Sequence, residues 1–134
     1  MKTVLILGAG KSAPYLISYL LDKAEEYNWN VVIADQDLEL AKSRVHGYSR
    51  GKAIKFDVTD GEARSAEISK ASVVVNMLAP HFQHMIGLAC ARLGVHMVSV
   101  SYQDQRMREL ETDAKRKKVL LLTEIGLDPG IDHM

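Results

Sequence analysis

The sequence predicts an α/β protein with a doubly wound, mostly parallel sheet of six strands. Short β-rich runs alternate along the chain with longer segments of helical periodicity, which is typical of parallel strands joined by crossover helices. The 134 residues are 47% hydrophobic, enough for the core of one domain, and no linker-like or low-complexity tract divides them. We therefore place a single domain over residues 1–134.

The first three elements form the clearest βαβ unit. The run KTVLILG, residues 2–8, is a buried strand; residues 13–27 carry apolar side chains on one helical face; and WNVVIAD, residues 29–35, is a second strand. The remaining elements alternate in the same way. Further helices are predicted over residues 37–45, 60–71, 81–93 and 104–118, and further strands over residues 53–58, 72–78, 96–101 and 119–126.

The loop between the first strand and the first helix combines parts of two phosphate-binding motifs. A triphosphate-binding loop needs a glycine where this chain has Leu5, so its Gly-Lys-Ser run is not such a loop. The dinucleotide fingerprint needs Gly8, Gly10 and a small third residue, which is Ala13. With a strand before and a helix N-terminus after, the loop predicts a Rossmann-type dinucleotide site. A glycine turn without any ligand is the alternative.

The end of the second predicted strand indicates which dinucleotide binds. Asp35 lies roughly 20 residues after the glycine loop, where an acidic residue accepts hydrogen bonds from the adenosine ribose. A 2′-phosphate would be repelled there, and Asp37 and Glu39 add negative charge. Lys42 and Arg44 follow and could fold back toward the site. We therefore predict NAD as the cofactor, with NADP possible.

Other cofactor contacts are expected beyond the carboxyl ends of the strands, where ligands of doubly wound sheets bind. Asp57 and Val58 follow the third predicted strand, where they could border the adenine. Capping of the next helix is an equally plausible role for Asp57. Asn76 and the segment after it follow the fourth strand, along the path to the nicotinamide ribose. The complete set of predicted cofactor-binding residues is Gly8, Gly10, Lys11, Ser12, Ala13, Asp35, Asp57, Val58, Asn76, Leu78 and Ala79.

The last nine residues, GLDPGIDHM, point to a substrate. A turn built on Pro129 and Gly130 precedes what reads as the start of a helix, whose backbone amides would suit a substrate carboxylate. Asp128 or Asp132 could pair with a substrate ammonium group. An amino-acid-derived small molecule matches both features.

This segment, together with VVVNML at 73–78 and MVSVSY at 97–102, resembles the glutamate-forming saccharopine dehydrogenase family along the whole chain. The resemblance implies oxidation of the secondary amine of saccharopine by hydride transfer to NAD or NADP. Water then splits the imine to glutamate and 2-aminoadipate semialdehyde, a reaction of lysine metabolism. By motif position, the resemblance assigns catalytic and substrate-binding roles to Tyr102 and Asp128, and substrate-binding roles to Ser101 and Gly130.

The resemblance also implies that the chain is one part of an enzyme. Family members continue into a large substrate and dimerisation domain, so we expect residues 1–134 to be the cofactor domain of a longer enzyme. Alone, it would be inactive, and a homodimer would form through the further domain. The alternative is a regulatory nucleotide-sensing domain of the kind that gates potassium transport, which has a similar length, glycine loop and acidic residue.

Composition excludes several other function classes. Lys and Arg together number 17, and so do Asp and Glu, so the chain has no net positive charge that would attract nucleic acid or an anionic membrane. A single cysteine, Cys90, cannot form an internal disulfide, and no run approaches the ~20 apolar residues of a membrane span, so a cytoplasmic location is expected. No metal is predicted, since His81 and His84 lack further ligands at a characteristic spacing.

Overall fold

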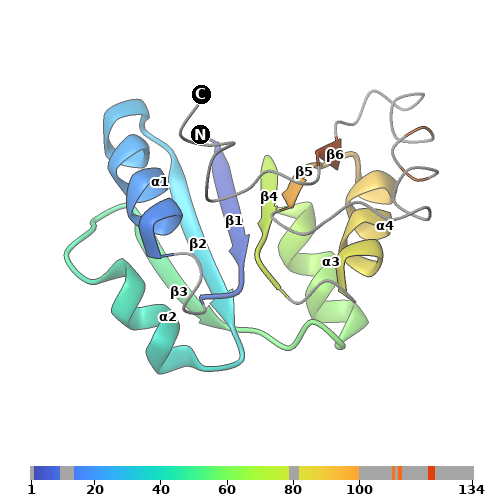
Figure 1. Cartoon of the computed structure of the whole chain (residues 1–134), viewed down its shortest axis with the longest axis horizontal. Coiled ribbons are helices and arrows are strands. Elements are labelled where there is room, and N and C mark those ends of the chain that lie inside the picture. Colours follow the sequence, from blue (N-terminus) through green and yellow to red (C-terminus); the bar gives the residue numbers. More distant parts are fainter. Residues whose placement is uncertain are drawn as a thin grey trace.

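A computed structural model describes residues 2–9, 14–78, 82–99, 110, 112 and 121–122 of the chain. Six parallel strands form one sheet in the order β3-β2-β1-β4-β5-β6 (Figure 1). The strands are β1 Thr3–Leu7, β2 Asn30–Asp35, β3 Gly51–Lys55, β4 Val73–Asn76, β5 His96–Ser99 and β6 Leu121–Leu122. The helices are α1 Pro14–Tyr27, α2 Leu38–Val45, α3 Gly61–Ser69 and α4 Gln83–Leu93.

The strand order reverses at β1, which confirms the predicted doubly wound sheet. The chain adds β2 and β3 on one side of β1, then crosses over to place β4 on the other side. Val4 of β1 is consequently in register with Val31 on one side and Val73 on the other. Ligands of such folds bind beyond the carboxyl ends of the two strands at which the order reverses, which here are β1 and β4.

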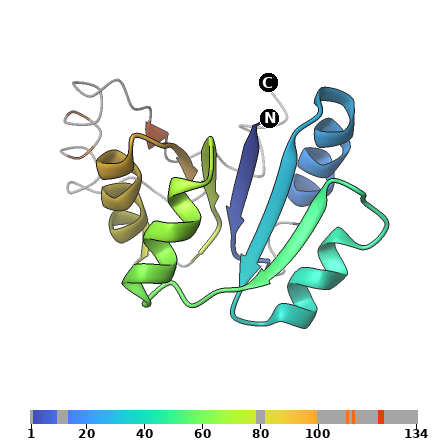
Figure 2. The ribbon, with the colours of Figure 1, turned by 180° about the vertical axis from the view of Figure 1, so that it is seen from behind.

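Two helical layers cover the two faces of the sheet. Helices α1 and α2 lie on one face, over the β1–β3 half of the sheet. Helices α3 and α4 lie on the other face, over the other half (Figures 1 and 2). Alternate residues of β1 enter different cores, as the two-residue period of a strand requires. The core beneath α1 and α2 includes Ile6, Ile17 and Ala41. The core beneath α3 and α4 includes Leu5, Leu7, Ile68, Ile86 and Met97.

Short polar side chains and glycine set the helix ends. The Asp37 carboxylate accepts a hydrogen bond from the Leu40 amide at the start of α2. The Asp60 carboxylate accepts from the Glu62 and Ala63 amides at the start of α3. Helix α4 ends at Gly94, which has the left-handed φ of 71° that glycine adopts without steric cost. With these N-terminal caps, α2 and α3 begin within two residues of the helix starts that the sequence predicted.

The third strand differs from its prediction. It spans Gly51–Lys55, whereas the sequence predicted residues 53–58. Phe56 and Val58 are buried beyond the end of the strand, in the core under α3 and α4, so their alternation with exposed residues resembles that of a strand. At the other end, a Cβ atom on Gly51 would lie 2.8 Å from Cβ of Val45, so the close packing of α2 requires a glycine there.

The second half of the chain is described only in part. Leu110 and Thr112 are helical, in agreement with the helix predicted over residues 104–118, whose other residues lie outside the described ranges. Strand β6 lies within the strand predicted over residues 119–126. Among the helices described, none has the length and apolar character needed to cross a membrane.

Candidate functional site

The glycine loop begins with a turn that only glycine suits. Gly8 has a φ of 100°, and its amide donates a hydrogen bond to the Ala34 carbonyl at 2.8 Å. A Cβ atom at this position would lie 3.3 Å from the carbonyl carbon and oxygen of Met77. The ends of β1 and β4 therefore approach one another across Gly8, as the predicted tight turn requires. A dinucleotide fits this cradle, because its pyrophosphate needs close access to the backbone.

Asp35, at the end of β2, is fixed by two backbone amides. Its Oδ2 accepts a hydrogen bond from the Ala9 amide at 2.7 Å, and its Oδ1 accepts one from the Asp37 amide at 2.8 Å. A carboxylate has about four acceptor positions, so roughly two remain for a ligand. The half-buried side chain thus joins the glycine loop to β2 and can still accept hydrogen bonds from ribose hydroxyls.

Arg44 reaches the same loop from the last turn of α2. Its Nε donates a hydrogen bond to the Ala9 carbonyl at 3.1 Å, and the side chain is half-buried. Lys42 is exposed and instead pairs with Glu39 on its own helix, at 3.7 Å between Nζ and Oε1. Of the two basic residues that could fold back, Arg44 is therefore the one that contacts the loop.

A hollow of about 220 Å³ lies beside Asp35 at the carboxyl ends of the strands. Its lining residues come from the ends of β2, β3 and β4 and the turn before α4: Ala34, Asp35, Gln36, Phe56, Val58, Leu78 and Phe82. Apolar walls with a carboxylate at one edge suit a flat heterocycle attached to a ribose. The structure brings the predicted residues Asp35, Val58 and Leu78 together here.

Sequence reasoning missed the two aromatic side chains of this hollow. Phe56 stands directly before the predicted Asp57 and Val58, and Phe82 stands directly before α4. An aromatic residue immediately after a strand or before a helix on the carboxyl side of the sheet is the signal that could have identified them. Gln36 was missed as well, although it follows Asp35 in the sequence.

Asp57 forms a local turn. Its Oδ1 accepts hydrogen bonds from the Thr59 hydroxyl at 2.7 Å and the Thr59 amide at 2.9 Å. These bonds hold the pKa of the Asp57 carboxyl below its ordinary value of 3.8, with a smaller contribution from Gln36. The alternative role of capping the next helix is wrong for Asp57, because Asp60 caps α3. The adenine contact stays a prediction, since Asp57 is exposed next to the hollow but does not line it.

Asn76 holds the turn after β4 that carries Leu78. The side chain is fully buried; its Oδ1 accepts a hydrogen bond from the Leu78 amide, and its Nδ2 donates one to the Ser99 hydroxyl at 3.4 Å. These contacts connect the ends of β4 and β5 and shape the turn that carries Leu78. The structure therefore gives Asn76 a supporting place, and contact with the nicotinamide ribose stays a prediction.

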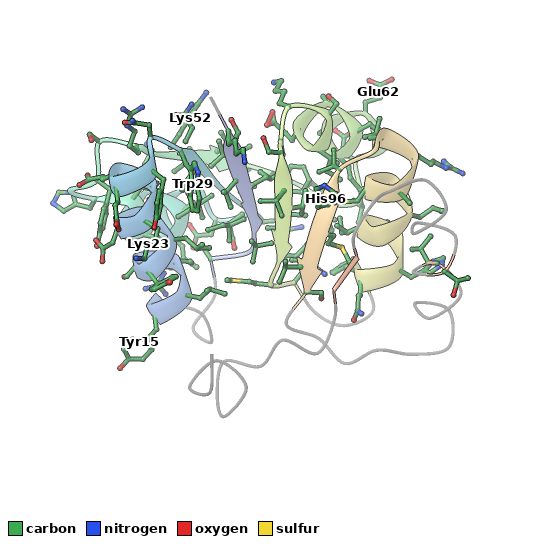
Figure 3. The ribbon with its side chains drawn as sticks, turned by 90° about the horizontal axis from the view of Figure 1, so that it is seen from above. Tyr15, Lys23, Trp29, Lys52, Glu62 and His96 are labelled. Carbon is green, nitrogen blue, oxygen red and sulfur yellow. The ribbon has the colours of Figure 1, made fainter. Side chains whose placement is uncertain are left out.

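A larger hollow, of about 410 Å³, lies at the opposite end of the strands. Its lining includes Thr3, Asn30 and Gly51, which begin β1, β2 and β3, and also Lys52. Figure 3 shows Lys52 at this end and Tyr15, at the start of α1, at the other. Because doubly wound sheets bind ligands at the carboxyl ends of their strands, the smaller hollow is the candidate site.

Several predicted residues lie outside the described ranges, and their roles stay predictions. They are Gly10, Lys11, Ser12, Ala13, Ala79, Ser101, Tyr102, Asp128 and Gly130. His81 is also outside. Cys90 is described and buried, and burial raises its thiol pKa to about 12, which favours a core residue over a nucleophile.

Comparison with known proteins identifies the family. The protein-family model described as the saccharopine dehydrogenase NADP-binding domain matches residues 4–122 of this sequence. The chain belongs to this family. The match confirms the resemblance drawn from the sequence motifs, and it gives no support to a regulatory domain of potassium transport. Membership also establishes a nicotinamide cofactor domain.

Relatives of this family extend well beyond the present chain. Saccharopine dehydrogenase (NADP(+), L-glutamate-forming) of Saccharomyces cerevisiae is 34% identical over 133 residues, covering 99% of this chain and 29% of that protein. Alpha-aminoadipic semialdehyde synthase of Arabidopsis thaliana is 34% identical over 148 residues, covering 98% of this chain and 14% of that protein. The chain therefore spans less than a third of either relative.

A solved structure of the same family has the same fold. The apo saccharopine dehydrogenase (L-Glu forming) from S. cerevisiae superposes with a TM-score of 0.85 at 32% identity. The superposition covers 99% of this chain and 29% of that one. The whole of the present chain thus corresponds to one segment of that larger enzyme.

Proposed function

We propose that this chain binds a nicotinamide adenine dinucleotide across the carboxyl ends of β1, β2, β3 and β4. The adenine occupies the hollow between Phe56 and Phe82, and the adenosine ribose lies against Asp35. The observation that carries the proposal is the 2.7 Å hydrogen bond between Asp35 and the Ala9 amide, directly beside that hollow. It supports the proposal because a carboxylate, the glycine loop and an apolar hollow, the features that a dinucleotide site needs, lie next to one another.

We further propose that NAD is preferred over NADP. The carboxylate of Asp35 retains acceptor positions for both ribose hydroxyls, and its negative charge repels a 2′-phosphate. Asp37 and Glu39 lie close to Asp35 in sequence, and both are exposed. The family description and the name of the yeast relative refer to NADP, which makes the preference of this chain a question for measurement.

We propose that the longer protein is an oxidoreductase that oxidises saccharopine or a related amino-acid-derived amine. The motif carrying Asp128 and the Ser101-Tyr102 pair supports this substrate class, with Tyr102 and Asp128 as catalytic groups and Gly130 beside them. The bound nicotinamide supplies the hydride acceptor. A further domain would complete the active site and form a homodimer. This assignment places the protein in lysine metabolism, with the cytoplasm as its expected location.

Calorimetric titration of the chain with NAD and with NADP tests the cofactor proposal. We expect tighter binding of NAD. Asp35→Ala should weaken NAD binding by roughly 1.5 to 3 kcal/mol, the scale of hydrogen bonds to a charged group, and should narrow the difference between the cofactors. Glu39→Gln is the matched control, since it removes a nearby charge without touching the Ala9 amide. Equal affinity for both cofactors, or tighter NADP binding, would refute the preference.

A further inference from the structure

The backbone around Ala9 is held from both sides by side chains of the β2–α2 region. Asp35 accepts a hydrogen bond from its amide at 2.7 Å, and Arg44 donates one to its carbonyl at 3.1 Å. Ala9 itself is fully buried. Arg44 is 35 residues away in sequence, so this contact ties the last turn of α2 to the glycine loop.

Such a contact matters here because the sequence leaves the loop free to adopt other conformations. Ala9 stands between Gly8 and Gly10, and glycine populates both signs of φ with similar ease. The steric preferences of the chain therefore do not fix the orientation of the Ala9 carbonyl. The hydrogen bond from Arg44 Nε can fix it, because it joins this carbonyl to a donor on a side chain of α2.

The direction of this carbonyl affects phosphate binding. A phosphate-binding loop works by turning backbone N–H groups toward the anion, and a carbonyl oxygen that faced the anion would repel it. Arg44 holds the Ala9 carbonyl toward α2. We propose that Arg44 is a positioning residue, which keeps the Ala9 carbonyl from facing a bound phosphate. This inference rests on the proposed dinucleotide function.

A positioning role for Arg44 predicts different changes in the affinities for NAD and NADP than a direct role in choosing between these cofactors. The hydrogen bond that orients the loop is common to NAD and NADP, so its loss should weaken both equally. A guanidinium that bound the 2′-phosphate would affect NADP alone. The test therefore needs variants that distinguish the effect of the positive charge of Arg44 from that of its Nε donor. The affinities for both NAD and NADP must be measured.

Two substitutions make this separation. Arg44→Gln removes the charge but keeps an N–H donor at the same distance along the side chain as Nε. Arg44→Met keeps an unbranched side chain of similar reach and has no donor. Lys42→Met is the matched control, because it removes a positive charge from α2 at an exposed position that pairs with Glu39. Thermal unfolding and far-UV circular dichroism of each variant check that it is folded.

Calorimetric dissociation constants for NAD and NADP then decide the inference. We expect Arg44→Met to weaken both cofactors by about tenfold, with their ratio unchanged, and Arg44→Gln and Lys42→Met to stay within about twofold of wild type. A glutamine variant that binds fivefold or more weakly overturns the inference, even if the methionine variant fails to fold. So does a folded methionine variant with wild-type affinity, or a loss confined to NADP. A wild-type chain that binds neither cofactor would instead refute the proposed function.

Discussion

At the scale of single residues, the site is built from side chains that hold backbone groups at the ends of strands. Asp35 accepts hydrogen bonds from the Ala9 amide after β1 and the Asp37 amide after β2. Asp57 closes a turn after β3, and Asn76 closes one after β4. Each bond joins a side chain to the backbone of a segment that directly follows a strand. The rim of the hollow beside Asp35 is therefore shaped without a ligand, which would lower the entropy cost of binding one.

Gly8 is the residue whose replacement should damage this arrangement most. Gly8→Ala adds left-handed backbone strain and a Cβ atom 3.3 Å from the Met77 backbone. Gly47→Ala is the matched control, because Gly47 also has a positive φ, of 85°, but nothing lies within 4 Å of its added Cβ. In urea unfolding, we expect a loss of about 1 kcal/mol for the control and about 2 to 3 kcal/mol for Gly8→Ala. Equal losses would show that the close approach at Gly8 is unimportant.

At the scale of elements, the helix caps place the walls of the hollow. Helix α3 begins directly after the turn that carries Val58, and Arg64 of α3 donates a hydrogen bond to the Val58 carbonyl at 2.7 Å. Arg64 Nη1 also lies 3.2 Å from the sulfur of Met85 in α4. The position of α3 therefore determines where Val58 lies in the wall of the hollow.

The cap of α3 can be tested by itself. Asp60→Ala removes the carboxylate that accepts from two amides of the first turn, and should lower the free energy of unfolding by about 1 kcal/mol. Asp60→Asn keeps an acceptor and should cost less. Ser65→Ala, at an exposed position on the same helix, serves as the control in urea unfolding. An alanine variant as stable as wild type would mean that the cap does not determine the start of α3.

Local sequence signals predicted the elements better than the contacts between them. The alternation of strands and helices, the turn at Gly8 and the acidic end of β2 at Asp35 all follow from short-range patterns of apolar and small residues. The end of β3 was overestimated because Phe56 and Val58 alternate with exposed residues just as strand residues do. The contact of Arg44 with Ala9 spans 35 residues and depends on how α2 packs, which no local pattern encodes.

At the scale of the whole molecule, the doubly wound topology gathers the site from distant parts of the chain. Because all paired strands run parallel, their carboxyl ends meet at one edge of the sheet, where the hollow lies. The chain covers 29% of the yeast enzyme that it resembles in structure. We propose that a nicotinamide bound here requires a further part of a longer protein for catalysis.

The proposed need for a further domain leads to a prediction about activity. The chain alone should not oxidise saccharopine, because hydride transfer needs the reacting carbons held ~3 to 3.5 Å apart in a site that controls water. A protein extended through a further domain should do so, and Asp128→Ala in that longer form should lose activity. Steady-state NADH formation compares the three proteins. Turnover by the short chain would contradict the proposed need for a further domain.

The central claim is that a dinucleotide binds at the carboxyl edge of the sheet, and amide chemical-shift mapping during titration with NAD tests it most directly. In ¹H–¹⁵N spectra, we predict the largest shifts at residues 8–9, 34–36, 56–58 and 76–78, which surround the hollow. Residues 49–52 and 67–70, around the larger hollow at the amino ends, should change little. The largest shifts at this second set, or no shifts at millimolar NAD, would contradict the account.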